Sequence, residues 1–220
     1  MLESDMVLGM NNYLEKYGIK YKNEVRMGIG IPDITFNLGA NSRIKRLDDY
    51  NMMEMLRYIQ EKQPTTYEQI CKYFNLGMVK VKKYISYLAE MSLVKIKECV
   101  IRTSKNIFNT KLGTVISIEA KLKDWKNGFI QAQRYLCFSD YSYLALPSDK
   151  IQNVDLDKLR NKGIGLLSVE NDKMREVLQP RKSNQCNYSF KYLVTSEILY
   201  DNNNIGKKRR RDKIFFEYRS

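Results

Sequence analysis

The 220-residue chain is 43% hydrophobic and 29% charged, which suits one soluble domain or two small ones, and no apolar run approaches the roughly 20 residues of a membrane helix. It contains no histidine, which excludes mechanisms built on an imidazole base or ligand, and its four cysteines lack the close spacing of zinc and iron–sulfur sites. Its 38 basic and 25 acidic residues give a net charge of +13, which favours a polyanionic partner, with nucleic acid the first candidate and an anionic membrane surface the second.

The first part of the chain is predicted to form a helix followed by a β-hairpin. Apolar residues at helical spacing indicate a helix over residues 3–17, and residues 23–27 and 31–38 indicate two strands joined by a Gly28–Gly30 turn. The N-terminal segment is acidic and lacks the basic start and apolar stretch of a secretory signal. We therefore expect a cytoplasmic protein.

Residues 47–112 differ in pattern from the segments on either side. Three helices and then two strands are expected here, over residues 50–63, 66–74, 78–91, 93–97 and 100–108. Thr65 and Glu68 fit a capping box at the start of the second helix. This order resembles a winged helix-turn-helix. Its predicted core consists of Ile70, Phe74, Leu76, Val79, Val81, Ile85, Leu88, Leu93 and Val94.

Basic residues lie on the two parts of this block that contact DNA in winged helices. The second helix of the motif carries Lys80, Lys82 and Lys83, and the wing carries Arg102 and Lys105, followed by the polar Asn106. The resemblance implies that these side chains bind duplex DNA. A solvated helix face, or a surface that docks a partner protein, would also account for the three lysines.

Beyond residue 112, strands and helices alternate, which is typical of an α/β sheet. Strands are predicted over residues 114–122, 141–147, 163–169 and 175–180. Helices are predicted over residues 124–139, 155–163 and 189–200. Because the block at 47–112 interrupts this pattern, we expect a discontinuous α/β domain, residues 1–46 and 113–220, with a winged-helix domain inserted into it.

The strand over residues 114–122 contains a carboxylate and a lysine inside an apolar run. Glu119 and Lys121 are two residues apart, so their side chains point to the same face of a strand whose other residues indicate burial. Burying a charge costs free energy unless the charge is paired or binds a metal. The two residues therefore form either a structural ion pair or part of a site.

Three short motifs outside the 47–112 block belong together. They are Pro32-Asp33 at the start of a strand, Glu119-Ala-Lys121 on a later strand, and Gln131-x-x-x-Tyr135 on the next helix. The ordered set resembles the PD-(D/E)xK nuclease superfamily, with the Q-x-x-x-Y element of its RecB-like members. In that superfamily the two acidic strands are hairpin neighbours, and removal of the 47–112 block would reconnect them here.

The resemblance implies a restriction-endonuclease-like mixed sheet flanked by helices, and Mg²⁺- or Mn²⁺-dependent hydrolysis of DNA. Asp33 and Glu119 would be hard oxygen ligands of the metal, with the Ala120 carbonyl as a third. Lys121 would orient or deprotonate the attacking water and offset developing negative charge. The helix residues Gln131 and Tyr135 would assist at the site or at the DNA backbone.

Several alternatives stay open at this stage. A further acid from the N-terminal region is expected, with Glu3, Glu15 and Glu24 as the candidates. The basic run Lys207–Arg211, within residues 206–220, is a DNA clamp, a nuclear-type address or a solvated tail. The chain is alternatively a non-catalytic DNA-binding protein, or a subunit of a defence or repair assembly. The sequence does not choose between endonuclease and exonuclease, or between a monomer, a homodimer and a larger assembly.

Overall fold

The computed structural model describes residues 2–41 and 44–200, and the chain falls into two compact units. One unit comprises Met1–Ser42 and Leu112–Ser220, and the other comprises Arg43–Lys111. The second unit therefore begins a few residues before the predicted boundary at 47, where Ile44 and Leu47 are already buried. None of the helices in the described residues is long and apolar enough to cross a membrane.

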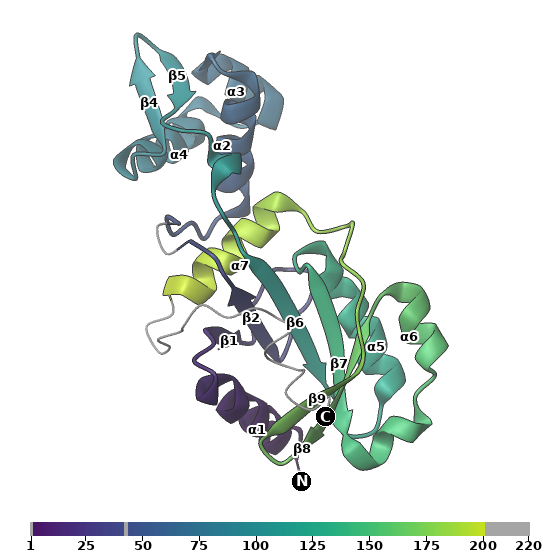
Figure 1. Ribbon diagram of the computed structural model, residues 1–220. Coiled ribbons are helices and arrows are strands. Elements are labelled where there is room, and N and C mark those ends of the chain that lie inside the picture. The colour runs from purple at the N-terminus through teal and green to yellow at the C-terminus, as the bar shows by residue number, and fades with distance from the viewer. Residues whose placement is uncertain (1, 42–43, 201–220) are drawn as a thin grey trace. The chain divides into compact units, whose positions relative to one another are not determined.

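The first unit is an α/β structure built on a six-stranded mixed sheet (Figure 1). Its strands, in spatial order, are β1 (Tyr21–Asn23), β2 (Ile34–Leu38), β6 (Thr114–Ala120), β7 (Tyr141–Pro147), β8 (Gly165–Glu170) and β9 (Lys173–Leu178). The central strands β6, β7 and β8 run parallel, and the remaining pairs are antiparallel. Strands buried on both faces are nearly continuous apolar runs, as the sequences of β6 and β7 are.

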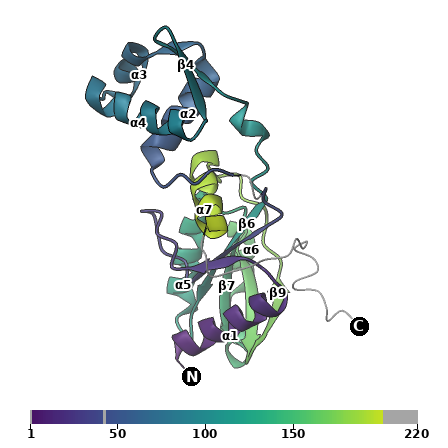
Figure 2. The same ribbon diagram turned by 90° about the vertical axis from the view of Figure 1, so that its left-hand side faces the viewer.

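Helices flank both faces of this sheet (Figures 1 and 2). The helices are α1 (Glu3–Lys16), α5 (Trp125–Arg134), α6 (Leu156–Lys162) and α7 (Tyr188–Tyr200). Buried side chains of α1 pack with Ile116, Ile118 and Ala120 of β6. Val115, which points to the opposite face of β6, packs instead with residues of α7 and with the segment that follows α5. Short 3₁₀ segments, Tyr135–Cys137 and Ser148–Asn153, extend the connections.

Two local predictions in this unit were wrong. The first hairpin strand is Tyr21–Asn23 rather than residues 23–27, because Glu24 has a left-handed backbone, with φ 52°, that ends the strand. Residues 24–33 form a long connection to β2. The helix predicted over residues 124–139 ends at Arg134 and continues as a 3₁₀ turn.

The second unit contains three helices and a small antiparallel sheet. Its helices are α2 (Tyr50–Lys62), α3 (Tyr67–Phe74) and α4 (Met78–Glu90), and its strands are β3 (Thr65–Thr66), β4 (Val94–Lys97) and β5 (Val100–Thr103), followed by a 3₁₀ segment (Ile107–Asn109). The strand order is β3-β5-β4. The turn between α3 and α4 begins at Asn75, whose left-handed backbone has φ 50°. Residues Glu98 and Cys99, both with positive φ, make the tight turn between β4 and β5.

Two details of this unit correct the sequence analysis. The capping box at the start of α3 uses Thr66 and Gln69, one residue later than predicted, because the extended backbone of β3 continues through Thr66 and the helix begins only at Tyr67. Val79 is 85% exposed and does not belong to the core. The buried residues of α4 are Val81, Ile85 and Leu88, spaced by four and three, and Val79 lies off that face.

Candidate active site

The candidate site is centred on Glu119, near the end of β6. Its side chain is only 2% exposed, as the apolar run around it predicted. Lys121 follows directly after the strand, and its Nζ lies 2.7 Å from Glu119 Oε1. The ammonium group is thus held beside a buried carboxylate rather than extended into solvent, with 14% of the lysine side chain exposed.

Asp33 reaches the same place from the neighbouring strand. The antiparallel register of β2 and β6 pairs Ile34 with Ile118, so residue 33 comes opposite the end of β6. Asp33 Oδ2 accepts a hydrogen bond of 2.7 Å from the backbone N–H of Ala120. A carboxylate from the first segment of the unit and a carboxylate–lysine pair from the second are therefore brought together, although the whole second unit separates them in sequence.

The two carboxylates of Asp33 and Glu119 outnumber the single ammonium group of Lys121, and the pKa values of all three are shifted. Burial raises the pKa of Asp33, and the Ala120 N–H and Lys121 only partly offset this. Burial also raises the pKa of Glu119, against the hydrogen bonds from Lys121 and Tyr135, and the charge of Asp33 raises it further. Burial acts to lower the pKa of Lys121, but Glu119, Asp33 and Glu3 together outweigh it and raise that pKa. A cation at this position would relieve the repulsion between the carboxylates.

Tyr135 holds Glu119 from the side of α5. Its ring is 1% exposed, and its hydroxyl lies 2.5 Å from Glu119 Oε2 and 3.1 Å from the carbonyl oxygen of Ile31. Burial and the neighbouring Glu119 raise the pKa of Tyr135, so the phenol keeps its proton and acts as a hydrogen-bond donor. Gly30 permits this arrangement, because a Cβ there would lie 2.8 Å from the tyrosine ring.

Gln131 lies on the face of α5 that carries the other site contacts. Gly128 touches Lys121, since a Cβ at Gly128 would lie 2.7 Å from Lys121 Cγ, and Tyr135 touches Glu119. Gln131 is three residues from the first and four from the second, so it shares their side of the helix. Its Oε1 atom is buried and has no hydrogen-bond partner among the described residues. This position on the helix is the one expected from the i, i+4 spacing of Gln131 and Tyr135.

Of the three candidate N-terminal acids, Glu3 is the one that contacts the site. Its Oε2 atom lies 3.7 Å from Lys121 Nζ, and its Oε1 accepts a 3.4 Å hydrogen bond from the backbone N–H of Leu122. Glu15 instead accepts a hydrogen bond from the hydroxyl of a tyrosine on β1. Glu24 acts on the site through its charge alone. Position 3 on α1 could not have been chosen from the sequence, because the contact depends on how α1 packs on the sheet.

The oxygen donors at the site suit a hard cation. Within residues 2–41 and 44–200, no three Asp, Glu, Cys or His side chains are grouped closely enough to hold a metal. Mg²⁺, however, is usually bound by one or two carboxylates with water and substrate phosphate in the remaining positions. The carboxylates of Asp33 and Glu119 with the Ala120 carbonyl provide such a partial set. The Ala120 N–H points towards Asp33, and the carbonyl of an extended residue points the same way as its N–H.

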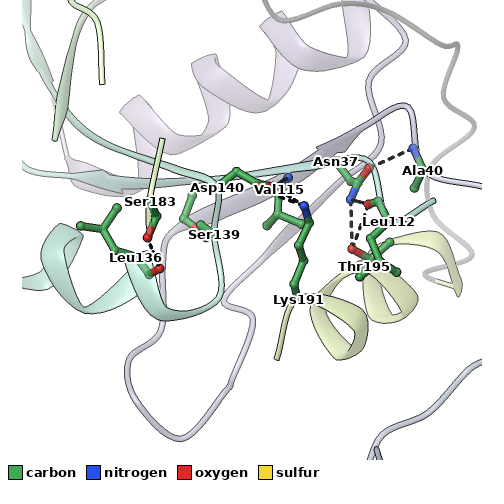
Figure 3. Close-up of polar contacts among 11 residues, drawn as sticks. Asn37, Ala40, Leu112, Val115, Leu136, Ser139, Asp140, Ser183, Lys191 and Thr195 are labelled. Carbon is green, nitrogen blue, oxygen red and sulfur yellow. Dashed lines mark hydrogen bonds and ion pairs between the residues drawn. The ribbon is translucent and has the colours of Figure 1, made fainter. Parts of the chain in front are cut away.

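Buried polar contacts fix the strands that carry the two acids (Figure 3). Asp140, at 4% exposure, accepts hydrogen bonds from the Val115 N–H at 2.8 Å and from Lys191 of α7 at 2.7 Å. Asn37 of β2 donates to the Leu112 carbonyl at 2.8 Å and to the hydroxyl of Thr195 at 3.1 Å. These contacts tie β2, β6 and α7 together and were not predicted.

The five basic residues expected to bind DNA are all exposed on the second unit. Lys80, Lys82 and Lys83 lie on α4, Arg102 lies on β5, and Lys105 follows it. In the described chain none of the five forms an ion pair with another residue, and Lys80 lies 5.7 Å from the centre of the Tyr84 ring. Their charges are available to a polyanion. The basic run Lys207–Arg211 lies outside the described residues.

Comparison with known proteins gives no relatives. No protein-family model matches the chain, and neither a curated protein nor a solved structure is significantly similar to it.

Proposed function

We propose that this chain is a metal-dependent deoxyribonuclease that hydrolyses DNA phosphodiester bonds. The observation that carries the proposal is the convergence of the Asp33 and Glu119 carboxylates with the Lys121 ammonium at the end of β6. A buried and a half-buried acid beside one lysine are costly for a structural role, and perturbed groups of this kind cluster at functional sites. The antiparallel neighbours β2 and β6 also fit the restriction-endonuclease-like arrangement that the motifs resemble.

Each residue has a role that follows from its chemistry. Asp33 and Glu119, with the Ala120 carbonyl, would hold Mg²⁺ or Mn²⁺. When bound, the ion stabilises negative charge on the scissile phosphate and acidifies a water molecule. Lys121 donates hydrogen bonds, so it orients the attacking water and offsets the charge that develops on the phosphate oxygens. Tyr135 positions Glu119 by donating a hydrogen bond to it.

In the proposed enzyme the second unit binds the duplex. Its two helices joined by a short turn, followed by the β4–β5 hairpin, support the interpretation as a winged helix-turn-helix. The exposed Lys80, Lys82 and Lys83 on α4 are suited to contact phosphates or base edges in a major groove. Arg102 and Lys105 would add phosphate contacts from the wing.

The test is cleavage of plasmid and linear DNA in Mg²⁺ or Mn²⁺. Asp33→Asn keeps an oxygen that can accept the Ala120 N–H but removes the charge, and Lys121→Gln removes the ammonium group. Each is expected to lower the cleavage rate by about 10²–10³-fold or more. Lys173→Ala, at an exposed position of β9, is the matched control and should cleave normally. A wild-type protein that binds DNA but cleaves no better than the two site variants would overturn the proposal.

One observation favours a second candidate, a non-catalytic DNA-binding protein that uses this fold as a scaffold. Both Glu119 oxygens and one Asp33 oxygen already have partners within the protein, so the site needs no metal to satisfy these atoms. If the chain is such a scaffold, it binds DNA equally well with and without a divalent ion. Asp33→Asn then changes neither the DNA affinity nor any cleavage signal. The same assay therefore separates the two functions.

A further inference from the structure

Two isoleucines shortly before the candidate catalytic Asp33 have side chains exposed to solvent. In the connection between β1 and β2, Ile29 is 38% exposed and Ile31 is 47% exposed. Val25 at the root of this connection is fully buried, and Met27 packs beside it against the α7 side of the sheet. The apolar residues at the root thus pack in the hydrophobic core, whereas the two isoleucines at the tip are exposed to solvent.

The tip is also fixed in position. The Ile31 carbonyl accepts the 3.1 Å hydrogen bond from Tyr135, the same hydroxyl that contacts Glu119. The Tyr135 ring lies against Gly30, between the two isoleucines, where no larger residue fits. Pro32, which restricts the backbone, is buried. The exposed isoleucines therefore belong to a segment that is bonded to Tyr135 and leads directly into Asp33.

The charges beside the tip indicate which partner this is. Arg26, three residues before Ile29 in sequence, and Arg134 are both exposed, and the Arg134 Cβ lies 3.9 Å from where a Gly30 Cβ would stand. Guanidinium groups attract phosphates, but isoleucine cannot contact a phosphate favourably. In a nucleic acid, apolar side chains contact sugars and bases, and they enter between base steps from the minor groove.

We propose that Ile29 and Ile31 form an apolar wedge that enters the minor groove of the DNA and unstacks a base step beside the scissile phosphate. The proposal rests on the proposed deoxyribonuclease function and adds duplex deformation to it. Arg26 and Arg134 bind the flanking phosphates, while the Tyr135 hydroxyl keeps the wedge in register with Glu119. The wedge makes duplex cleavage depend on how easily the step at the cut unstacks.

The first experiment compares two substrates that differ in stacking at the cleavage position. One is a fully paired duplex, and the other carries a single mismatch at the cut, where unstacking is less costly. The double variant Ile29→Ser/Ile31→Ser is expected to cleave the paired duplex about tenfold more slowly, because it loses the apolar contacts that offset the cost of unstacking. It should cleave the mismatched duplex at nearly the wild-type rate. Ile130→Ser, which removes a 50% exposed isoleucine from α5, should affect neither rate.

The second experiment measures unstacking without cleavage. Duplexes with 2-aminopurine at successive positions are bound in Ca²⁺, and the base that unstacks becomes more fluorescent. Wild type should raise the fluorescence at one step, and the double variant should not raise it at equal DNA occupancy. Equal loss of cleavage on both substrates, or no fluorescence rise with wild type, would overturn the wedge. A rise without any cleavage in Mg²⁺ would support the wedge and overturn only the hydrolase function.

Discussion

The substitution Tyr135→Phe removes one hydroxyl group and tests whether the hydrogen bond from Tyr135 to the buried Glu119 carboxylate stabilises the first unit. The phenylalanine keeps the buried ring, including its contact with Phe138 at a centroid distance of 5.8 Å. What is lost is the donor to Glu119 Oε2 at 2.5 Å and to the Ile31 carbonyl at 3.1 Å. A hydrogen bond to a charged group contributes about 1.5–3 kcal/mol, and the carboxylate left behind is 2% exposed, so water does not replace the donor freely.

We therefore expect Tyr135→Phe to lower the free energy of unfolding of the first unit by about 2–3 kcal/mol, which is about 4–12 °C in Tm for a unit of this size. Trp125, the chain's one tryptophan, lies on α5 of this unit, so its fluorescence reports this transition. The matched control is Tyr21→Phe, whose hydroxyl donates at 2.6 Å to Glu15, an exposed carboxylate. Water can solvate Glu15, and the control should cost less than about 1 kcal/mol. Equal losses in the two variants would refute the reasoning.

Three further predictions follow from the site and from the second unit. Folding raises the pKa values of Asp33 and Glu119 above their ordinary values of 3.8 and 4.5, so the folded state binds protons more tightly than the unfolded state. Without divalent ions, the stability that these two carboxyl groups contribute is therefore present below their ordinary pKa values and is lost as the pH rises through the raised ones. Since a metal binds the ionised forms, Mg²⁺ should raise Tm more at pH 8 than at pH 5, and an equal rise at both would contradict this. Gly128→Ala would bring a Cβ to 2.6 Å from Leu144 Cδ1 and 2.7 Å from Lys121 Cγ, so these neighbours must move. We expect the free energy of unfolding to fall by about 1–3 kcal/mol, measured by thermal unfolding. Because Lys121 is displaced, cleavage should be at least about tenfold slower in a single-turnover assay. Replacing Lys80, Lys82 and Lys83 together with Ala should weaken duplex binding and reduce the slope of log K against log salt by about 2.7, measured by fluorescence anisotropy; an unchanged slope would assign α4 to another partner.

The centre of the site could be predicted because its signal is local. Glu119 and Lys121 stand two residues apart in an apolar run, and strand geometry alone places both side chains on one face. Their pairing at 2.7 Å and the burial of Glu119 agree with that prediction. The α/β class was likewise predictable from the alternation of strands and helices after residue 112, since each strand there is a mostly apolar run bounded by a helical segment.

Other parts of the site depend on packing between distant segments. Glu3 reaches Lys121 only because α1 lies across the end of β6, and nothing in its neighbouring residues distinguishes it from Glu15. The bond from Tyr135 to Ile31 joins residues 104 apart in sequence, and the Asp140–Lys191 pair joins residues 51 apart. Such contacts leave no periodic trace in a single sequence.

The wrong local predictions have backbone causes. Glu24 adopts a left-handed conformation that strand propensity does not anticipate, and it moves the first hairpin strand towards the N-terminus. The extended backbone of β3 continues through Thr66, so the capping box of α3 begins one residue later than predicted. Val79 fits an apolar pattern by residue type, but the buried face of α4 is set by Val81, Ile85 and Leu88.

Single-turnover cleavage of a labelled duplex in Mg²⁺, with DNA affinity measured in parallel, tests most directly whether the acids and the lysine form a hydrolytic centre. Glu119→Gln and Asp33→Asn are expected to retain duplex affinity within about twofold while cleaving at least about 10²-fold more slowly than wild type. Cleavage at the wild-type rate by either variant, or none by wild type at saturating DNA and Mg²⁺, would contradict the account.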